Sequence, residues 1–228
     1  MDYRGIPDRL AWVRDQIAER QLRGGWSHPV QIVAVTKGHP VEAVEAALDA
    51  GLADVGENRV QEALGKQALC PDPRVRWHLI GRLQRNKAKQ AVGRFVLIHS
   101  VDRPELVLEL ARRCPEGSRQ RVLLEVNCSG EPQKGGVEPE GVLALVRQVA
   151  AESRLAFGGL MTMAALSEDE GVARSAFRRL RTVKAEVEEA GFPVADLSMG
   201  MSGDFPVAVE EGATIIRLGT LLFGERTQ

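Results

Sequence analysis

The chain has 228 residues, of which 44% are hydrophobic, enough apolar material for a buried core in one large domain or two small ones. Its 30 basic and 31 acidic residues give a formal net charge of -1. This balance excludes a global positive field that would attract nucleic acid or an anionic membrane. An anionic ligand must therefore be held by a local site.

Residues that commonly bind metals or form disulfides are few and scattered. The cysteines, Cys70, Cys114 and Cys128, are odd in number and far apart, which argues against a disulfide framework and fits a reducing compartment. No His or Cys pair has the spacing of a zinc site. The N-terminal segment lacks an apolar signal core, and no apolar run reaches membrane-spanning length. We therefore expect a cytoplasmic protein with neither a metal site nor a membrane segment.

Hydrophobic periodicity predicts a leading helix, followed by strands that alternate with helices. Leu10, Val13 and Ile17 share one face of a helix over residues 7–23, and Gly24-Gly25 ends it. Apolar runs then predict eight strands, over residues 31–37, 54–57, 75–81, 95–99, 121–127, 155–161, 196–199 and 213–218. Helical stripes lie between them, around residues 41–48, 60–64, 85–92, 104–110, 138–151, 172–187 and 205–211.

Eight strands that alternate with helices favour a closed parallel barrel. Short connections and strands rich in Val, Ile and Leu fit a parallel sheet buried on both faces. The alternative is an open doubly wound sheet, but Thr36-Lys37-Gly38-His39-Pro40 stands where such a sheet carries a glycine-rich dinucleotide fingerprint. We predict an α/β fold, a single (β/α)8 TIM-type barrel domain over residues 1–228, with residues 1–25 as an extra N-terminal helix packed on it.

Functional residues of such a barrel gather where strands end and loops begin. The sequence predicts these residues there: Lys37, Asn58, His78, Asn127, Met161, residues 198–202 and residues 217–220. Lys37 follows an apolar strand, and apolar walls would disfavour its ammonium form and lower the pKa of its amine. Such an amine is suited to a Schiff base with an aldehyde. The alternative is a lysine that closes the strand and points into solvent.

Two loops near the end of the sequence have the composition of an anion site. Residues 198–204 and 217–220 follow the last two predicted strands, a common phosphate position in these barrels. Their glycines let backbone N–H groups approach an anion, and Ser202 and Thr220 add hydroxyl donors. The alternative is that these residues only form turns.

Arg217 interrupts an apolar strand and needs a partner if it is buried. It either forms an ion pair with an inward acid such as Glu57 or Glu125, or it binds a ligand. If the ligand is pyridoxal phosphate, Arg217 at the ring nitrogen would donate a hydrogen bond and leave the ring neutral. A neutral ring favours reversible Schiff-base formation over strong carbanion chemistry.

Several long motifs occur in order along nearly the whole chain. They include Ala34-Val35-Thr36-Lys37, Gly56-Glu57-Asn58-Arg59-Val60-Gln61-Glu62, Trp77-His78-Leu79-Ile80-Gly81-Arg82-Leu83-Gln84-Arg85-Asn86-Lys87 and Arg217-Leu218-Gly219-Thr220. With these motifs the sequence resembles the pyridoxal-phosphate homeostasis proteins. The resemblance implies a barrel related to the N-terminal domain of alanine racemase. It also implies the cofactor pyridoxal 5'-phosphate on Lys37, its phosphate near Ser202, Gly219 and Thr220, Arg217 at the ring nitrogen, and Asn58 and Met201 lining the cofactor.

His78 is also predicted to contact the cofactor, although a histidine in Trp77-His78-Leu79-Ile80 is more often a hydrogen-bonded core residue. The resemblance implies a carrier that acts in cofactor homeostasis and amino-acid balance rather than in rapid catalysis. Apo enzymes would be its recipients and amino acids further ligands, and we expect a monomer.

Two other functions compete with the carrier. A weak amino-acid racemase would use Lys37 as its base, but racemases with this barrel take a catalytic tyrosine from a second domain. The only tyrosine here is Tyr3, and eight residues follow Thr220. An RNA-binding module would use the basic run from Arg82 to Lys89, but the near-neutral chain has only 4% aromatic residues for base stacking.

Overall fold

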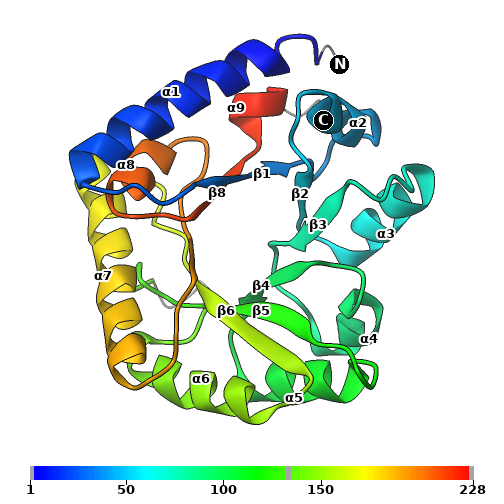
Figure 1. The fold of residues 1–228 in the computed structure, drawn as a ribbon, viewed down its shortest axis with the longest axis vertical. Coiled ribbons are helices and arrows are strands. Elements are labelled where there is room, and N and C mark those ends of the chain that lie inside the picture. The colour runs from blue at the N-terminus through cyan, green and yellow to red at the C-terminus, as the bar shows by residue number, and fades with distance from the viewer. Residues whose placement is uncertain (1–2, 132–134, 226–228) are drawn as a thin grey trace.

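The computed structural model describes residues 3–131 and 135–225. Eight parallel strands follow one another around a closed barrel, and the last strand pairs with the first (Figure 1). The strands are β1 (Gln31–Val35), β2 (Asp54–Glu57), β3 (Arg76–Leu79), β4 (Leu97–Val101), β5 (Gln120–Glu125), β6 (Leu155–Met161), β7 (Asp196–Ser198) and β8 (Ile215–Leu218). The predicted (β/α)8 barrel is confirmed.

Helices connect the strands and surround the barrel (Figure 1). They are α1 (Ile6–Gly24), α2 (Glu42–Asp49), α3 (Val60–Leu69), η1 (Arg85–Lys87), α4 (Ala88–Ala91), α5 (Pro104–Arg113), η2 (Pro139–Gly141), α6 (Val142–Ala151), α7 (Glu170–Glu189), α8 (Phe205–Glu210) and α9 (Thr220–Phe223). In the described ranges, no helix combines the length and the apolar character needed to cross a membrane.

Side chains alternate between the two faces of each strand, and this alternation creates two apolar layers. Inside the barrel, a small cluster consists of Val33, Leu97, Leu123, Met161 and Ile215. A much larger buried cluster occupies the space between the strands and the helices. The interior is thus a packed core rather than a channel, and open space is left to the ends of the barrel.

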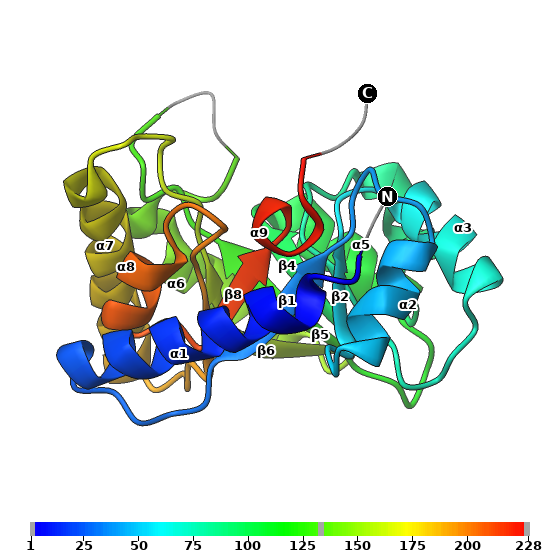
Figure 2. The same ribbon diagram turned by 90° about the horizontal axis from the view of Figure 1, so that it is seen from above.

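The leading helix α1 lies across the outer side of β1 and β8 and packs against α8 and α9 (Figures 1 and 2). Its buried residues, Ile6, Leu10, Val13 and Ile17, form one helical stripe. The extra N-terminal helix is therefore confirmed, while residues 1–2 of its predicted range lie outside the described residues. That residues 1–228 form a single domain stays a prediction.

Candidate functional site

A cavity of about 430 Å³ opens at the carboxyl ends of the strands. Seven of the eight residues predicted to contact a cofactor line it: Lys37, Asn58, Met201, Ser202, Arg217, Gly219 and Thr220. Gly203, from the predicted anion-binding loop over residues 198–204, also lines it. Other parts of the wall were not predicted as site residues, namely Val35, His39, Ile80, Gly81, Arg82, Gly135, Met163 and Leu166. The barrel topology brings these distant segments to one rim because all eight strands point the same way.

Lys37 is half-buried and begins the turn that follows β1. It shares the cavity wall with the apolar side chains of Val35, Ile80, Met163 and Leu166. Lys37 thus lies at the mouth of the barrel beside apolar walls, as its place in the sequence predicted.

The backbone before Lys37 is fixed by a buried ion pair on the outer side of the barrel. The Thr36 hydroxyl donates to Glu57 Oε1 over 2.6 Å, and Lys66 Nζ donates to the same oxygen over 2.6 Å and to the Thr36 carbonyl over 2.8 Å. Glu57 is fully buried and Lys66 is 6% exposed. Burial raises the pKa of Glu57 even though Lys66 lies beside it.

The backbone after Lys37 is held by the same group of charges. The Gly38 N–H donates to Glu62 Oε1 over 2.6 Å, and Lys66 Nζ reaches that oxygen over 3.1 Å. Lys66 therefore ties together both sides of the Lys37 turn. Sequence reasoning missed this network, although Glu62 and Lys66 are four residues apart on one helix, a spacing typical of ion pairs.

Asn58 is positioned by an unusually close approach of two loops. A Cβ atom at Gly81 would lie 2.4 Å from the Asn58 carbonyl oxygen and 2.7 Å from its Cα atom, so only glycine fits there without moving Asn58. The Ser100 hydroxyl donates to the Gly81 carbonyl over 2.7 Å and holds the second loop from behind. The loops after β2 and β3 are therefore fixed relative to each other.

The two predicted anion-binding loops meet through Ser202. Its hydroxyl oxygen accepts the backbone N–H groups of Gly219 and Leu221 over 3.3 and 3.2 Å, which leaves its own O–H free to donate toward the cavity. The first loop can turn here because Gly200 has a φ of 94° and packs closely against Ala208 and Phe205. The predicted convergence of these loops is confirmed.

Arg217 is buried at 4% exposure and forms part of the cavity wall. Its Nη1 donates to the carbonyl and hydroxyl oxygens of Ser198 over 2.8 and 2.7 Å, and its Nη2 donates to the Thr162 carbonyl over 3.0 Å. Burial lowers the pKa of Arg217 to about 10, so the guanidinium stays charged at neutral pH. The proposed ion pair with Glu57 is wrong, because Glu57 contacts Lys66 on the outer side of β2.

Glu125 brings a carboxyl group to the same cavity from the end of β5. It is only 4% exposed. Burial and the nearby negative charge of Asp102 raise its pKa to about 7, although the charge of Arg217 opposes them. Sequence reasoning named Glu125 only as a partner for Arg217, whereas its place in the cavity makes it a titratable wall residue in its own right.

Several residues predicted at the strand ends do not line this cavity: His78, Asn127 and Met161, and from the two loops Ser198, Met199, Gly200 and Leu218. His78 is 1% exposed and lies inside the barrel, where its ring nitrogens contact Asp54 Oδ1 and His99 Nε2, each over 2.9 Å. This position does not support a contact between His78 and the cofactor and fits the alternative of a hydrogen-bonded core residue. Asn127 donates to Glu138 Oε1 over 2.9 Å, and Met161 belongs to the inner apolar cluster.

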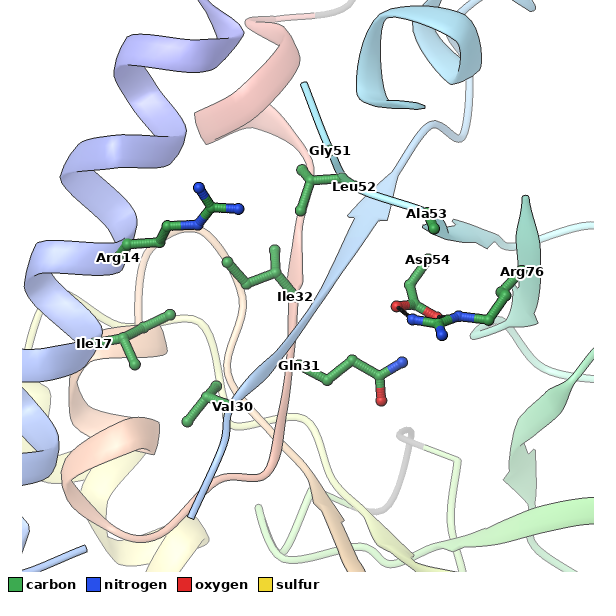
Figure 3. Close-up of a pocket in the computed structure, with 10 residues that line it drawn as sticks. All are labelled: Arg14, Ile17, Val30, Gln31, Ile32, Gly51, Leu52, Ala53, Asp54 and Arg76. Carbon is green, nitrogen blue, oxygen red and sulfur yellow. Dashed lines mark hydrogen bonds and ion pairs between the residues drawn. The ribbon is translucent and has the colours of Figure 1, made fainter. Parts of the chain in front are cut away.

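A second cavity, of about 350 Å³, lies at the amino ends of β1, β2 and β3, beside α1 (Figure 3). Arg14 and Ile17 reach it from α1, while Gln31, Asp54 and Arg76 lie on the strand side. None of the predicted site residues lines it. The candidate functional site is therefore the cavity at the carboxyl ends.

Comparisons with known proteins find similar chains over almost the full length. Residues 16–227 match the family model of the alanine racemase N-terminal domain. The chain is 43% identical to the pyridoxal phosphate homeostasis protein of Aquifex aeolicus, over 96% of this chain and 97% of that one. PipY of Synechococcus elongatus, solved with PLP bound, is 39% identical, with a TM-score of 0.84 over 96% of this chain and 100% of the other.

A more distant likeness concerns the fold alone. The alanine racemase of Clostridium difficile in complex with cycloserine is 14% identical, with a TM-score of 0.76 over 97% of this chain and 60% of the racemase. Full-length matches at much higher identity include the homeostasis proteins of Aquifex aeolicus and Pseudomonas aeruginosa, at 43% and 40%. The chain therefore belongs to the pyridoxal phosphate homeostasis protein family, and its barrel is that of the alanine racemase N-terminal domain.

Proposed function

We propose that the chain binds pyridoxal 5'-phosphate in the cavity at the carboxyl ends of the strands, as a Schiff base on Lys37. The observation that carries the proposal is that Lys37, Arg217 and the loop residues Ser202 and Thr220 line one cavity. These groups match the three polar parts of the cofactor: an aldehyde, a ring nitrogen and a phosphate. PipY was solved with PLP bound, which supports pyridoxal phosphate as the ligand.

Each residue would have a distinct role toward the cofactor. Pyridoxal phosphate supplies an aldehyde that condenses with amines and a ring that accepts electrons. Lys37 provides the amine, and the hydroxyl groups of Ser202 and Thr220 donate to the phosphate. Arg217 donates to the ring nitrogen, and because its guanidinium has no proton-accepting site, the nitrogen stays unprotonated. Asn58 and Met201 line the cofactor.

Within this proposal the protein is a cytoplasmic, monomeric carrier that serves cofactor homeostasis and amino-acid balance and passes the cofactor to apo enzymes. The printed names of its relatives support homeostasis. An unprotonated ring nitrogen also disfavours strong carbanion chemistry. In the described part of the chain, Tyr3 is not among the residues that line the cavity, so the tyrosine that the racemase alternative would need is not supplied there.

Borohydride reduction followed by peptide mass mapping tests the attachment. We expect visible absorption from the loaded protein and a pyridoxyl label on the peptide that contains Lys37. Lys37→Ala should lose both signals. Lys184→Ala, a change in the exposed pair of Lys184 with Glu188, serves as the control and should keep both. A label on a different lysine in the wild-type protein refutes the assignment.

Transfer and turnover assays test the carrier role. The loaded protein should reactivate an apo form of a pyridoxal phosphate enzyme faster than the Lys37→Ala variant mixed with the same total cofactor. Racemisation and transamination should be assayed with the same samples across the amino acids. Robust turnover in either assay would overturn the carrier in favour of the weak racemase or another enzyme.

A further inference from the structure

A line of polar side chains crosses the interior of the barrel from one cavity to the other. Arg217 Nη1 contacts Ser198 Oγ over 2.7 Å, Ser198 Oγ contacts His99 Nδ1 over 2.9 Å, and His99 Nε2 contacts His78 Nδ1 over 2.9 Å. His78 Nε2 then contacts Asp54 Oδ1 over 2.9 Å. Arg217 lines the cavity at the carboxyl ends and Asp54 lines the cavity at the amino ends (Figure 3).

The line is buried along its whole length. Ser198 and His99 are fully buried, and His78, Arg217 and Asp54 are 1%, 4% and 5% exposed. Five different strands supply these residues: β8, β7, β4, β3 and β2. Buried polar groups are costly unless they are hydrogen-bonded, and here each group has a partner at both of its polar ends.

The two ends of the line determine the direction of every hydrogen bond. Arg217 can only donate, so Ser198 Oγ must accept from it. At the other end Asp54 is ionised: burial acts to raise its pKa, but hydrogen bonds from His78 and Arg76 outweigh burial and hold that pKa well below its ordinary value. Asp54 must therefore accept from His78.

For two neutral imidazoles between these ends, only one arrangement of the hydrogens is consistent. Burial holds the pKa of His99 well below its usual value, so its ring is neutral. His78 Nε2–H donates to Asp54, because the carboxylate can only accept. With a single proton on the His78 ring, His99 Nε2–H then donates to His78 Nδ1, and the Ser198 hydroxyl donates to His99 Nδ1. All the hydrogens point from the Arg217 end toward the negative charge of Asp54.

We infer that Ser198, His99, His78 and Asp54 form a hydrogen-bonded relay that positions Arg217 from the opposite end of the barrel. The relay fixes the Ser198 hydroxyl so that its lone pairs face Arg217 Nη1, and this orients the guanidinium toward the cavity. These four are positioning residues, since His78 lies outside the cavity and acts on Arg217 only through His99 and Ser198. The inference rests on the proposed role of Arg217 at the ring nitrogen.

Two variants test the relay at different distances from Arg217. Ser198→Ala removes the adjacent link, and we expect it to weaken pyridoxal phosphate binding about tenfold, the usual effect of losing a hydrogen bond to a charged group. His78→Leu breaks the line two links away and should weaken binding by about threefold or more, because Arg217 keeps its direct bonds while Ser198 loses its fixed orientation. Both should shift the visible absorption maximum, which a loss of stability alone would not do.

Gln120→Leu is the matched control for His78→Leu. Gln120 is also a buried polar strand residue, at 4% exposure, and donates to the Phe95 carbonyl over 3.0 Å. It lies outside the relay, so its variant should bind with wild-type affinity and an unchanged spectrum. Unchanged affinity and spectrum in both Ser198→Ala and His78→Leu would overturn the relay.

Nitrogen-15 NMR of the cofactor-free wild-type protein gives a second test that does not depend on any variant folding. At about pH 8 we expect both His99 and His78 to be protonated on Nε2 and unprotonated on Nδ1. His99 protonated on Nδ1 would overturn the relay. Failure of the wild-type protein to be labelled at Lys37 would instead refute the proposed function, and the two outcomes are thereby distinguished.

Discussion

Lys66→Met removes the charge that joins both sides of the Lys37 turn. The ammonium of Lys66 makes three hydrogen bonds, of 2.6 to 3.1 Å, to Glu57, Glu62 and the Thr36 carbonyl. Methionine is apolar and flexible enough to fill the same space, but it leaves the fully buried carboxylate of Glu57 with only the Thr36 hydroxyl from this network.

The expected loss is large because one partner of a buried ion pair is removed. Such changes cost about 3–5 kcal/mol, a substantial part of the roughly 5–15 kcal/mol that stabilises a typical domain. Burial already raises the pKa of Glu57, and without Lys66 the pKa should rise further. Because a raised folded pKa favours the protonated folded state, the loss should shrink as the pH falls through that pKa.

Urea unfolding at pH 7 measures this loss, and Lys184→Met is the matched control. Lys184 also forms an ion pair, with Glu188 over 2.5 Å, but at 29% and 42% side-chain exposure. Exposed pairs on one helix contribute about 0.3–0.5 kcal/mol, so the control should lose little. The double change Glu57→Gln with Lys66→Met should recover part of the stability, because no buried charge then lacks a partner.

The same variant tests whether the network presents Lys37 to the cofactor. We expect Lys66→Met to bind pyridoxal phosphate more weakly than Lys184→Met does. The Thr36 carbonyl loses its bond to Lys66, and Glu62, which accepts the Gly38 N–H, loses its ammonium partner. A loss of less than about 1 kcal/mol in Lys66→Met would refute the reasoning, since a buried pair should cost several times more than that when broken.

Three other changes probe the cavity wall. Glu125→Gln should stabilise the cofactor-free protein by up to about 3 kcal/mol at pH 8, because the pKa of Glu125 rises from 4.5 to about 7 on folding. The stability of the wild-type protein should therefore fall as the pH rises from about 5 to 7, and that of the variant should not. Parallel profiles of urea stability against pH for the two proteins would contradict this. Gly81→Ala should lower the free energy of unfolding by more than about 2 kcal/mol, because the added Cβ meets the Asn58 backbone. The control is Gly65→Ala, at an exposed helix position with open space. It should stabilise the protein by about 0.5–1 kcal/mol in the same thermal or urea assay. Arg217→Glu should protonate the ring nitrogen and shift the absorption spectrum; an unchanged spectrum with the cofactor bound would place Arg217 elsewhere.

The sequence predicted the barrel because each strand is a short apolar run between turn signals, and strand boundaries were the main error. The first strand was predicted over residues 31–37 but ends at Val35. The Thr36 N–H still donates to the Gly56 carbonyl of β2 over 3.1 Å, but its carbonyl accepts from Lys66 Nζ instead of continuing the ladder. The four-residue helix α9 was not predicted, since a single turn is too short to show a helical period.

Residues that follow directly after a strand could be placed at the site from the sequence. Residues whose position depends on depth inside the barrel, or on which face of the strand the side chain occupies, could not. His78 was placed at the rim, but Ile80, two residues later on the same face of the chain, lines the cavity. Side chains alternate along a strand, so residues two apart share a face and differ only in depth. For Glu57 the error concerned the face of the strand, because its side chain points outward to Lys66. This partner depends on how α3 packs against the barrel, and no local sequence pattern gives that packing.

The side of the cavity built by Ser202 is constructed differently from the side built by Lys37. The oxygen of Ser202 already accepts the N–H groups of Gly219 and Leu221, so those two donors are occupied before an anion arrives. An anion in the cavity would therefore meet the Ser202 O–H first, with its hydrogen directed outward by the two bonds that the oxygen accepts. The hydroxyl is thus oriented by the loop after β8, while the amine of Lys37 is carried on a backbone anchored by Glu57, Glu62 and Lys66. Because the two ends are fixed by independent contacts, loosening one should weaken binding without displacing the other.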